Sequence, residues 1–73
     1  MEQRYHINVF WSQADECWVA DVPDLQSCAA LGETPAEALA EVEIAMEAWL
    51  AVAHADGLPI PEPRYRGVKL AAG

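Results

Sequence analysis

The amino-acid sequence predicts an α+β fold in which a three-stranded antiparallel meander is covered on one face by a single long helix. Residues 5–31 contain three short apolar stretches separated by polar or proline-containing turns, a pattern typical of strands joined by short connections. Residues 35–55 are rich in Ala, Glu, Leu and Met, which are strong helix formers. A chain of 73 residues suffices for one domain, so we assign residues 1–73 to a single domain.

The first two strands are predicted from their apolar patterns. Residues 5–11 place an apolar side chain at every second position, which is the period of a strand with one buried face; these side chains are Tyr5, Ile7, Val9 and Trp11. Phe10 adds apolar surface to the opposite face. Residues 17–22 form a second apolar run after the polar stretch 12–16, so the two runs are expected to pair as a β-hairpin.

The third strand is expected over residues 27–31, which are mostly small and apolar. Pro23 ends the preceding strand, because proline lacks the N–H that a β-ladder needs, and Asp24 is typical of the turn that follows. We expect Gly32 to end the third strand with a positive φ, a conformation that glycine adopts readily.

The helix has the clearest boundaries in the sequence. Thr34 can cap its N-terminus, and Glu37, three residues later, completes a capping box. Pro35 falls at the first helical position, where the missing N–H does no harm. Gly57 provides the C-terminal stop, so the helix is predicted over residues 35–55.

Two apolar stripes run along the predicted helix at spacings of three and four residues. The side chains expected to pack on the sheet are those of Leu39, Val42, Met46, Trp49, Leu50 and Ala53. A thinner stripe on roughly the opposite side consists of Ile44, Ala48, Ala51, Val52 and Ala55. A helix that covers one sheet face does not need this second stripe. We interpret it as the interface of a homo-oligomer, although scattered apolar side chains also occur on the surfaces of monomers.

The chain beyond the helix is predicted to be extended. Proline recurs at every second position from 59 to 63, which excludes a helix and favours an open connector. We expect Tyr65, Gly67 and the run Val68–Leu70 to add a short fourth strand at a sheet edge. The complete order would then be β-β-β-α-β.

The charge of the chain argues against a primary role in binding DNA or RNA. Twelve Asp and Glu side chains face four Lys and Arg, which gives a formal net charge of −8. Three of the four basic residues (Arg64, Arg66 and Lys69) lie in the last ten positions. A nucleic-acid binder needs basic side chains to displace counterions from phosphate, whereas an acidic chain attracts a basic partner.

The location of the protein is predicted from what the sequence lacks. No signal pattern opens the chain, and no apolar stretch is long enough to span a bilayer. We therefore expect a cytoplasmic protein with no membrane association. Cys17 and Cys28 match no zinc spacing and fit a reducing compartment as free thiols.

The sequence offers no convincing catalytic set. His6 and His54 lie on different predicted elements, and no serine or glycine falls in a nucleophile elbow or a phosphate loop. We therefore expect neither an enzyme nor a cofactor. Asp21, Asp24 and Glu33 could in principle hold a hard cation through oxygen ligands, so a metal-dependent hydrolase is kept as an alternative to the simpler interpretation of solvated turn residues.

Several short motifs occur in a characteristic order along the chain. They are Asp21–Leu25 (Asp-Val-Pro-Asp-Leu), Cys28, Gly32–Thr34 (Gly-Glu-Thr), Glu37–Leu39 (Glu-Ala-Leu) and residues 57–63 (Gly-Leu-Pro-Ile-Pro-Glu-Pro). In this order and spacing, residues 5–63 resemble HicB-like antitoxins. The resemblance implies a partial ribonuclease-H-like fold without a working nuclease site. It also implies a partner, a small basic HicA-type ribonuclease that cleaves mRNA and is blocked by direct binding.

Two departures from the family pattern matter for function. Gln26 and Ser27 stand where the family often has Pro-Gly before the cysteine, which is expected to reshape that turn. Many members also carry a C-terminal DNA-binding domain that represses their operon. The 73 residues contain no such domain, so we do not expect repression by this chain alone.

The contact surface for a toxin is predicted from charge. The carboxylates expected near one end of the sheet are those of Asp21, Asp24, Glu33, Glu37 and Glu41. No Lys or Arg lies between residues 5 and 63 to neutralise them, and such an acidic surface is what a basic protein would dock against. The alternative hypothesis is a stand-alone, self-associating structural or adaptor domain with no toxin partner.

Overall fold

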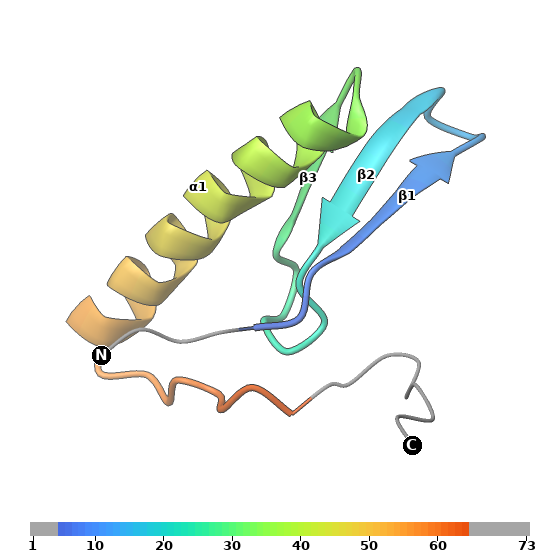
Figure 1. The fold of residues 1–73 in the computed structure, drawn as a ribbon. Coiled ribbons are helices and arrows are strands. Elements are labelled where there is room, and N and C mark those ends of the chain that lie inside the picture. Colours follow the sequence, from blue (N-terminus) through green and yellow to red (C-terminus); the bar gives the residue numbers. More distant parts are fainter. Residues whose placement is uncertain (1–4, 65–73) are drawn as a thin grey trace.

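The fold is a two-layer arrangement of one sheet and one helix. The computed structural model describes residues 5–64, and the elements follow the order β1 (Asn8–Ser12), β2 (Cys17–Asp21), β3 (Ala29–Gly32) and α1 (Pro35–Ala55). The three strands form an antiparallel sheet in the order β1-β2-β3. Helix α1 lies along one face, over β3 and β2, while β1 forms the far edge (Figure 1). The predicted α+β class is confirmed. The predicted fourth strand falls outside the described residues.

Strand β1 begins three residues later than the sequence pattern predicts. Tyr5 is buried, and its hydroxyl donates a hydrogen bond to the backbone carbonyl of Pro61 in the segment after the helix. Tyr5 belongs to the core, and Ile7 packs against the core. The ladder therefore starts at Asn8, which pairs with Asp21, and continues to Ser12, which pairs with Cys17.

The connection between β2 and β3 is a compact turn, so the predicted start of the third strand at residue 27 is wrong. The backbone N–H of Val22 donates to the carbonyl of Cys28 (2.9 Å), and Leu25 donates back to Val22 (3.1 Å). Ser27 has a φ of 61°, which is incompatible with an extended strand. The turn buries Leu25 almost completely, so it is part of the core.

Gly32 has a different role from the predicted one. It is the last residue of β3, where it pairs with Trp18, so the strand ends there as predicted, but among the described glycines Gly57, not Gly32, has a positive φ (69°). Glycine is required here because the space beside the helix backbone is too small for a Cβ. A Cβ built on Gly32 would lie 2.9 Å from the Cα of Ala38, well inside the normal contact distance of carbon atoms. The sheet and the helix backbone therefore meet at this point.

The helix is capped as the sequence predicts, and its bounds are confirmed. The hydroxyl of Thr34 accepts a hydrogen bond from the Glu37 N–H (3.0 Å), and the Glu37 carboxylate accepts one from the Glu33 N–H (2.9 Å). At the other end, the N–H of Leu58 donates to the carbonyl of Ala53 (2.8 Å) around Gly57. This pattern is a Schellman C-cap, which satisfies carbonyls that have no partner within the helix.

The core lies between α1 and the strands β2 and β3. Its buried residues are Tyr5, Ala20, Val22, Leu25, Cys28, Ala38 and Val42. Met46, Trp49 and Leu50 pack against this core as predicted, whereas Leu39 is less covered, with 37% of its surface exposed. Because the helix approaches Gly32 so closely, the small side chain of Ala38 occupies the contact instead.

Candidate functional site

The five acidic residues predicted to contact a partner do not gather at one end of the sheet. Asp21 ends β2 and pairs with Ala29 at the beginning of β3, and Asp24 lies in the adjoining turn. Glu33 follows Gly32 at the other end of β3. Four strand residues rise about 10 Å from first to last, so the two groups are separated along the strand. The predicted grouping is wrong because β3 runs antiparallel to β2. It takes the chain from the end of the sheet that holds Asp21 to the opposite end, where the helix begins.

Two of these five carboxylates, those of Glu37 and Asp24, already make structural hydrogen bonds. Glu37 accepts the N–H of Glu33 at the helix N-terminus (2.9 Å), and one oxygen of Asp24 accepts the N–H of Arg64 (3.0 Å). Asp21 is half-buried, and its Oδ1 has no hydrogen-bond partner within residues 5–64. Glu33, Glu37 and Glu41 are exposed, so these three members of the set are accessible to another protein.

The same separation contradicts the metal alternative. Asp21 and Glu33 lie at opposite ends of β3, so they cannot form one coordination sphere with Asp24. In residues 5–64, no group of three or more His, Cys, Asp or Glu side chains is placed to hold a metal ion.

Two nucleophilic side chains, those of Cys28 and Tyr5, are in environments that suppress reactivity. Cys28 is buried, and its thiol pKa is raised by burial and further by the charge of Asp21. The pKa of the Tyr5 phenol is raised by burial and by Asp24. A thiol needs a lowered pKa to act as a nucleophile near neutral pH, so the environment of Cys28 is that of a structural residue.

Helix α1 carries exposed carboxylates for which residues 5–64 provide no ion-pair partner among the described contacts. Glu41, Glu43 and Glu47 are exposed, and we call these three residues the acidic helix surface. Residues 5–64 hold eleven of the twelve carboxylates and, of the four Lys and Arg, Arg64 alone. Like charges four residues apart repel each other mildly, as at Glu43 and Glu47. A positively charged partner would remove this repulsion.

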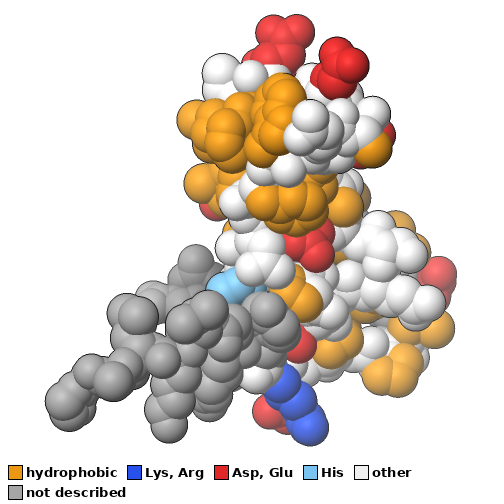
Figure 2. All heavy atoms as spheres, turned by 90° about the vertical axis from the view of Figure 1, so that its right-hand side faces the viewer, with side chains coloured by type: hydrophobic (Ala, Val, Ile, Leu, Met, Phe, Trp, Pro, Cys, Tyr) orange, Lys and Arg blue, Asp and Glu red, His pale blue; other side chains and the backbone are white. Residues whose placement is uncertain are grey.

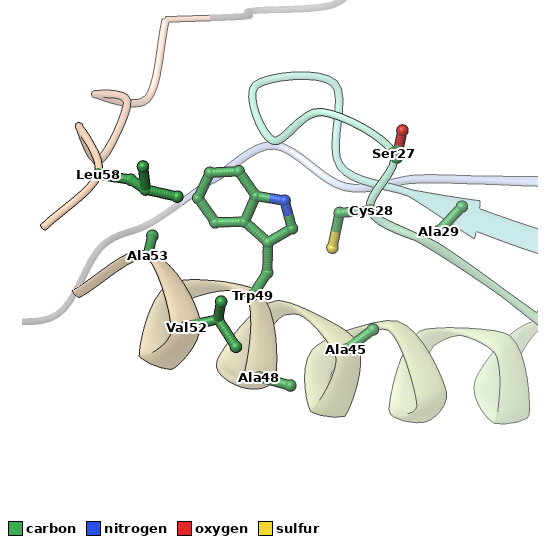
Figure 3. Close-up of a pocket in the computed structure, with 9 residues that line it drawn as sticks. All are labelled: Ser27, Cys28, Ala29, Ala45, Ala48, Trp49, Val52, Ala53 and Leu58. Atoms are coloured by element: carbon green, nitrogen blue, oxygen red, sulfur yellow. The ribbon is translucent and has the colours of Figure 1, made fainter. Parts of the chain in front are cut away.

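The second apolar stripe of the helix is exposed, as its position in the sequence predicts. Ile44 is 62% exposed and Val52 is 57% exposed. Beside this stripe, α1 and the start of β3 enclose an open apolar groove of about 480 Å³, with Trp49 at its base (Figure 3). The indole N–H of Trp49 donates to the Gln26 carbonyl (3.0 Å), which orients the ring. Sequence reasoning did not anticipate the groove, although Ala48 and Val52 of the stripe line it.

A second apolar surface lies along β1, where the sequence pattern predicts a buried face. Val9, Phe10 and Trp11 are 37%, 47% and 50% exposed. Helix α1 covers β3 and β2 and barely reaches β1, so Trp11 is covered mainly by Trp18, whose ring meets it edge-on at 5.7 Å. Hydrophobic side chains are prominent on the β1 side of the molecule (Figure 2). The apolar Phe10 between Val9 and Trp11 is the sequence signal that both faces of this strand are apolar.

Comparison of the chain with known family models, with curated proteins and with solved structures gives no match. The resemblance to HicB-like antitoxins, including its ribonuclease-H-like fold, therefore stays a prediction that rests on the order of motifs in the sequence. Over residues 5–64, no helix has both the length and the apolar character needed to cross a membrane.

Proposed function

We propose that the chain is a HicB-like antitoxin domain that neutralises a small, basic HicA-type mRNA ribonuclease by direct protein–protein binding. The observation that carries this proposal is the acidic helix surface, which is exposed and has no Lys or Arg between residues 5 and 63 to compensate it. Complementary charge speeds association with a basic protein and selects against acidic partners. In this role the chain binds the toxin rather than RNA and performs no chemistry itself.

The placement of the carboxylates shapes the proposed contact. Glu41 and Glu47 lie on the outer half of the helix with Ile44 between them in the sequence, and all three are exposed. A surface that mixes carboxylates with an exposed aliphatic side chain suits the groove of a ribonuclease, where basic residues meet phosphate and apolar atoms meet the ribose and base. We therefore centre the proposed contact on α1 rather than on the turn that contains Asp21 and Asp24.

The test is a titration of the chain with the HicA-type ribonuclease whose gene lies nearest to its own, together with an mRNA cleavage assay. We expect a complex in the micromolar range or tighter at physiological salt, and inhibition of cleavage at the same stoichiometry. Raising the salt concentration should weaken the complex, because exposed charges are screened over roughly 10 Å at 0.1 M salt. Absence of a complex at micromolar concentrations would contradict the proposal.

A pair of charge-matched variants locates the contact. Glu43→Gln combined with Glu47→Gln removes two charges from the helix, whereas Glu16→Gln combined with Glu62→Gln removes two exposed charges elsewhere. We expect the helix variant to slow association with the toxin by at least about tenfold more than the control variant. Equal effects would show that net charge alone matters and that α1 is not the contact.

A second function, a self-associating adaptor domain without a toxin, is favoured by the exposed apolar side chains of β1 and of the second helix stripe. It predicts a stable oligomer that neither binds nor inhibits the ribonuclease in the titration above. The antitoxin proposal also places the chain in the cytoplasm, where the mRNA cleaved by its target is found.

A further inference from the structure

The groove beside Trp49 is open because the side chains on both of its walls are small. Ala45 and Ala48 line it from α1, and Ala29 lines it from the start of β3 (Figure 3). These three positions project only methyl groups, so helix and strand leave about 480 Å³ between them. This volume falls within the range of roughly 300–1,000 Å³ that is typical of binding sites.

The groove is held in shape by hydrogen bonds to the backbone. The indole N–H of Trp49, at the base, donates to the Gln26 carbonyl (3.0 Å). Leu58 lines the groove just beyond the helix, where its N–H donates to the Ala53 carbonyl (2.8 Å). Val52 and Leu58 are 57% and 53% exposed, so the rim is apolar. A site that is formed in advance loses less conformational entropy when it binds.

A carboxylate lies next to the groove on the same side of the helix. Ala45, Ala48 and Val52 are separated by three and four residues, so they lie in a line along α1. Glu41 continues this line, four residues or about 6 Å of helix before Ala45, and its side chain is exposed. An apolar groove with a carboxylate beside it suits a segment that carries a large apolar side chain next to Lys or Arg.

We propose that this groove is the anchor site for the basic partner: a large aliphatic or aromatic side chain of that protein fills the groove beside Trp49, and a neighbouring Lys or Arg pairs with Glu41. The inference rests on the proposed function and adds to it the contact that keeps the complex together. Exposed charges mainly speed association. Apolar side chains buried in a pocket, often against tryptophan, dominate the binding energy at many interfaces.

Charge favours a basic partner over a second copy of this chain. Each copy carries a net charge of −8, and a dimer through this side of α1 would include Glu41 of both helices. A parallel pair would bring the two Glu41 side chains together. An antiparallel pair centred on Ala48 would place each Glu41 near the C-terminal end of the other helix, where the helix dipole is negative. A basic partner meets neither penalty.

Ala48→Met tests the inference without changing the charge. Methionine is a good helix former and flexible enough to fill an irregular gap, so at position 48 its side chain occupies the groove. Ala51→Met is the matched control, because Ala51 is also exposed on α1 but does not line the groove. We expect Ala48→Met to raise the dissociation constant of the complex with the HicA-type ribonuclease at least about tenfold more than Ala51→Met does, through faster dissociation.

The rate constants separate the groove from the charges. Ala48→Met should leave the association rate constant and its salt dependence unchanged, whereas Glu41→Gln should slow association and weaken the salt dependence. If the wild-type chain forms the complex and the two methionine variants have equal dissociation constants, the groove is not the anchor site and the proposed function still stands. If the wild-type chain forms no complex, the proposed function fails and this inference fails with it.

Measurements on the full chain without the ribonuclease test whether the groove is open to a partner. We expect a urea midpoint for Ala48→Met no lower than that for Ala51→Met, because a methionine that enters an open groove displaces only water. A lower midpoint for Ala48→Met alone would show that other residues of this chain already fill the groove, and would overturn the proposal. A wild-type dimer that Ala48→Met dissociates and Ala51→Met does not would assign the groove to a second copy and overturn it as well.

Discussion

Replacing Gly32 by alanine tests whether the packing of the helix on the sheet is limited by space at one residue. The added Cβ would lie 2.9 Å from the Cα of Ala38 and 2.9 Å from the carbonyl carbon of Glu37. Both are backbone atoms, so no side chain can rotate away and the first turn of α1 must move. Overpacking of this kind costs about 1–3 kcal/mol, while the stiffer unfolded chain returns about 0.4–1 kcal/mol.

The expected net loss is about 1–2 kcal/mol of unfolding free energy, which corresponds to a fall in Tm of roughly 5–15 °C for a domain of this size. Thermal and urea unfolding followed by circular dichroism would measure it. Gly32→Val should be worse than Gly32→Ala, although valine is the better strand former. Ala29→Val, on an exposed position of the same strand, is the control and should be neutral or slightly stabilising. If stability instead rose from glycine to alanine to valine at position 32, strand propensity would dominate and the steric argument would be wrong.

Three further predictions concern the turn, the cap and the alkaline limit of stability. Ser27→Gly should stabilise the chain by about 1 kcal/mol in urea unfolding, because a left-handed conformation is costly for serine and not for glycine; an unchanged midpoint would contradict this. Thr34→Ala should cost about 1 kcal/mol by removing the cap on Glu37, and Thr34→Ser should largely restore it. The pKa of Tyr5 and that of Cys28 are raised in the folded state, so the unfolded chain loses these protons first and stability should fall as the pH rises above about 9. Unfolding midpoints between pH 7 and 11 would show this fall, and Tyr5→Phe should reduce its upper part.

The elements most fully predictable from the sequence are those whose hydrogen bonds are local. The helix begins after Thr34 and ends before Gly57 because both caps are formed by residues within a few positions of the bonds that they make. The third strand was less predictable at its start. Its apolar composition extends back to residue 27. Backbone hydrogen bonds that join Val22, Leu25 and Cys28 instead place residues 22–28 in a turn.

The candidate site was predicted less well because charge in a sequence carries no information about distance in space. Asp21 and Glu33 are twelve positions apart and look close to the same turn, yet β3 separates them. Charge alone did not single out Glu43 and Glu47, although both are exposed on the helix with no local structural role among the described contacts. The composition predicted an acidic surface, and the orientation of the helix on the sheet determines which carboxylates are exposed.

The sequence by itself determined the order of the three strands in residues 5–64, the bounds of the helix and the strongly acidic character of the chain, since these follow from periodicity, capping and composition. The tertiary structure decided which apolar residues are covered. The close approach of Gly32 and Ala38 sets α1 over β3 and β2, which buries Ala38, leaves Leu39 at the margin and leaves β1 with Val9, Phe10 and Trp11 exposed. Alternation identifies the apolar face of a strand, but only the position of the opposing layer determines whether that face is buried.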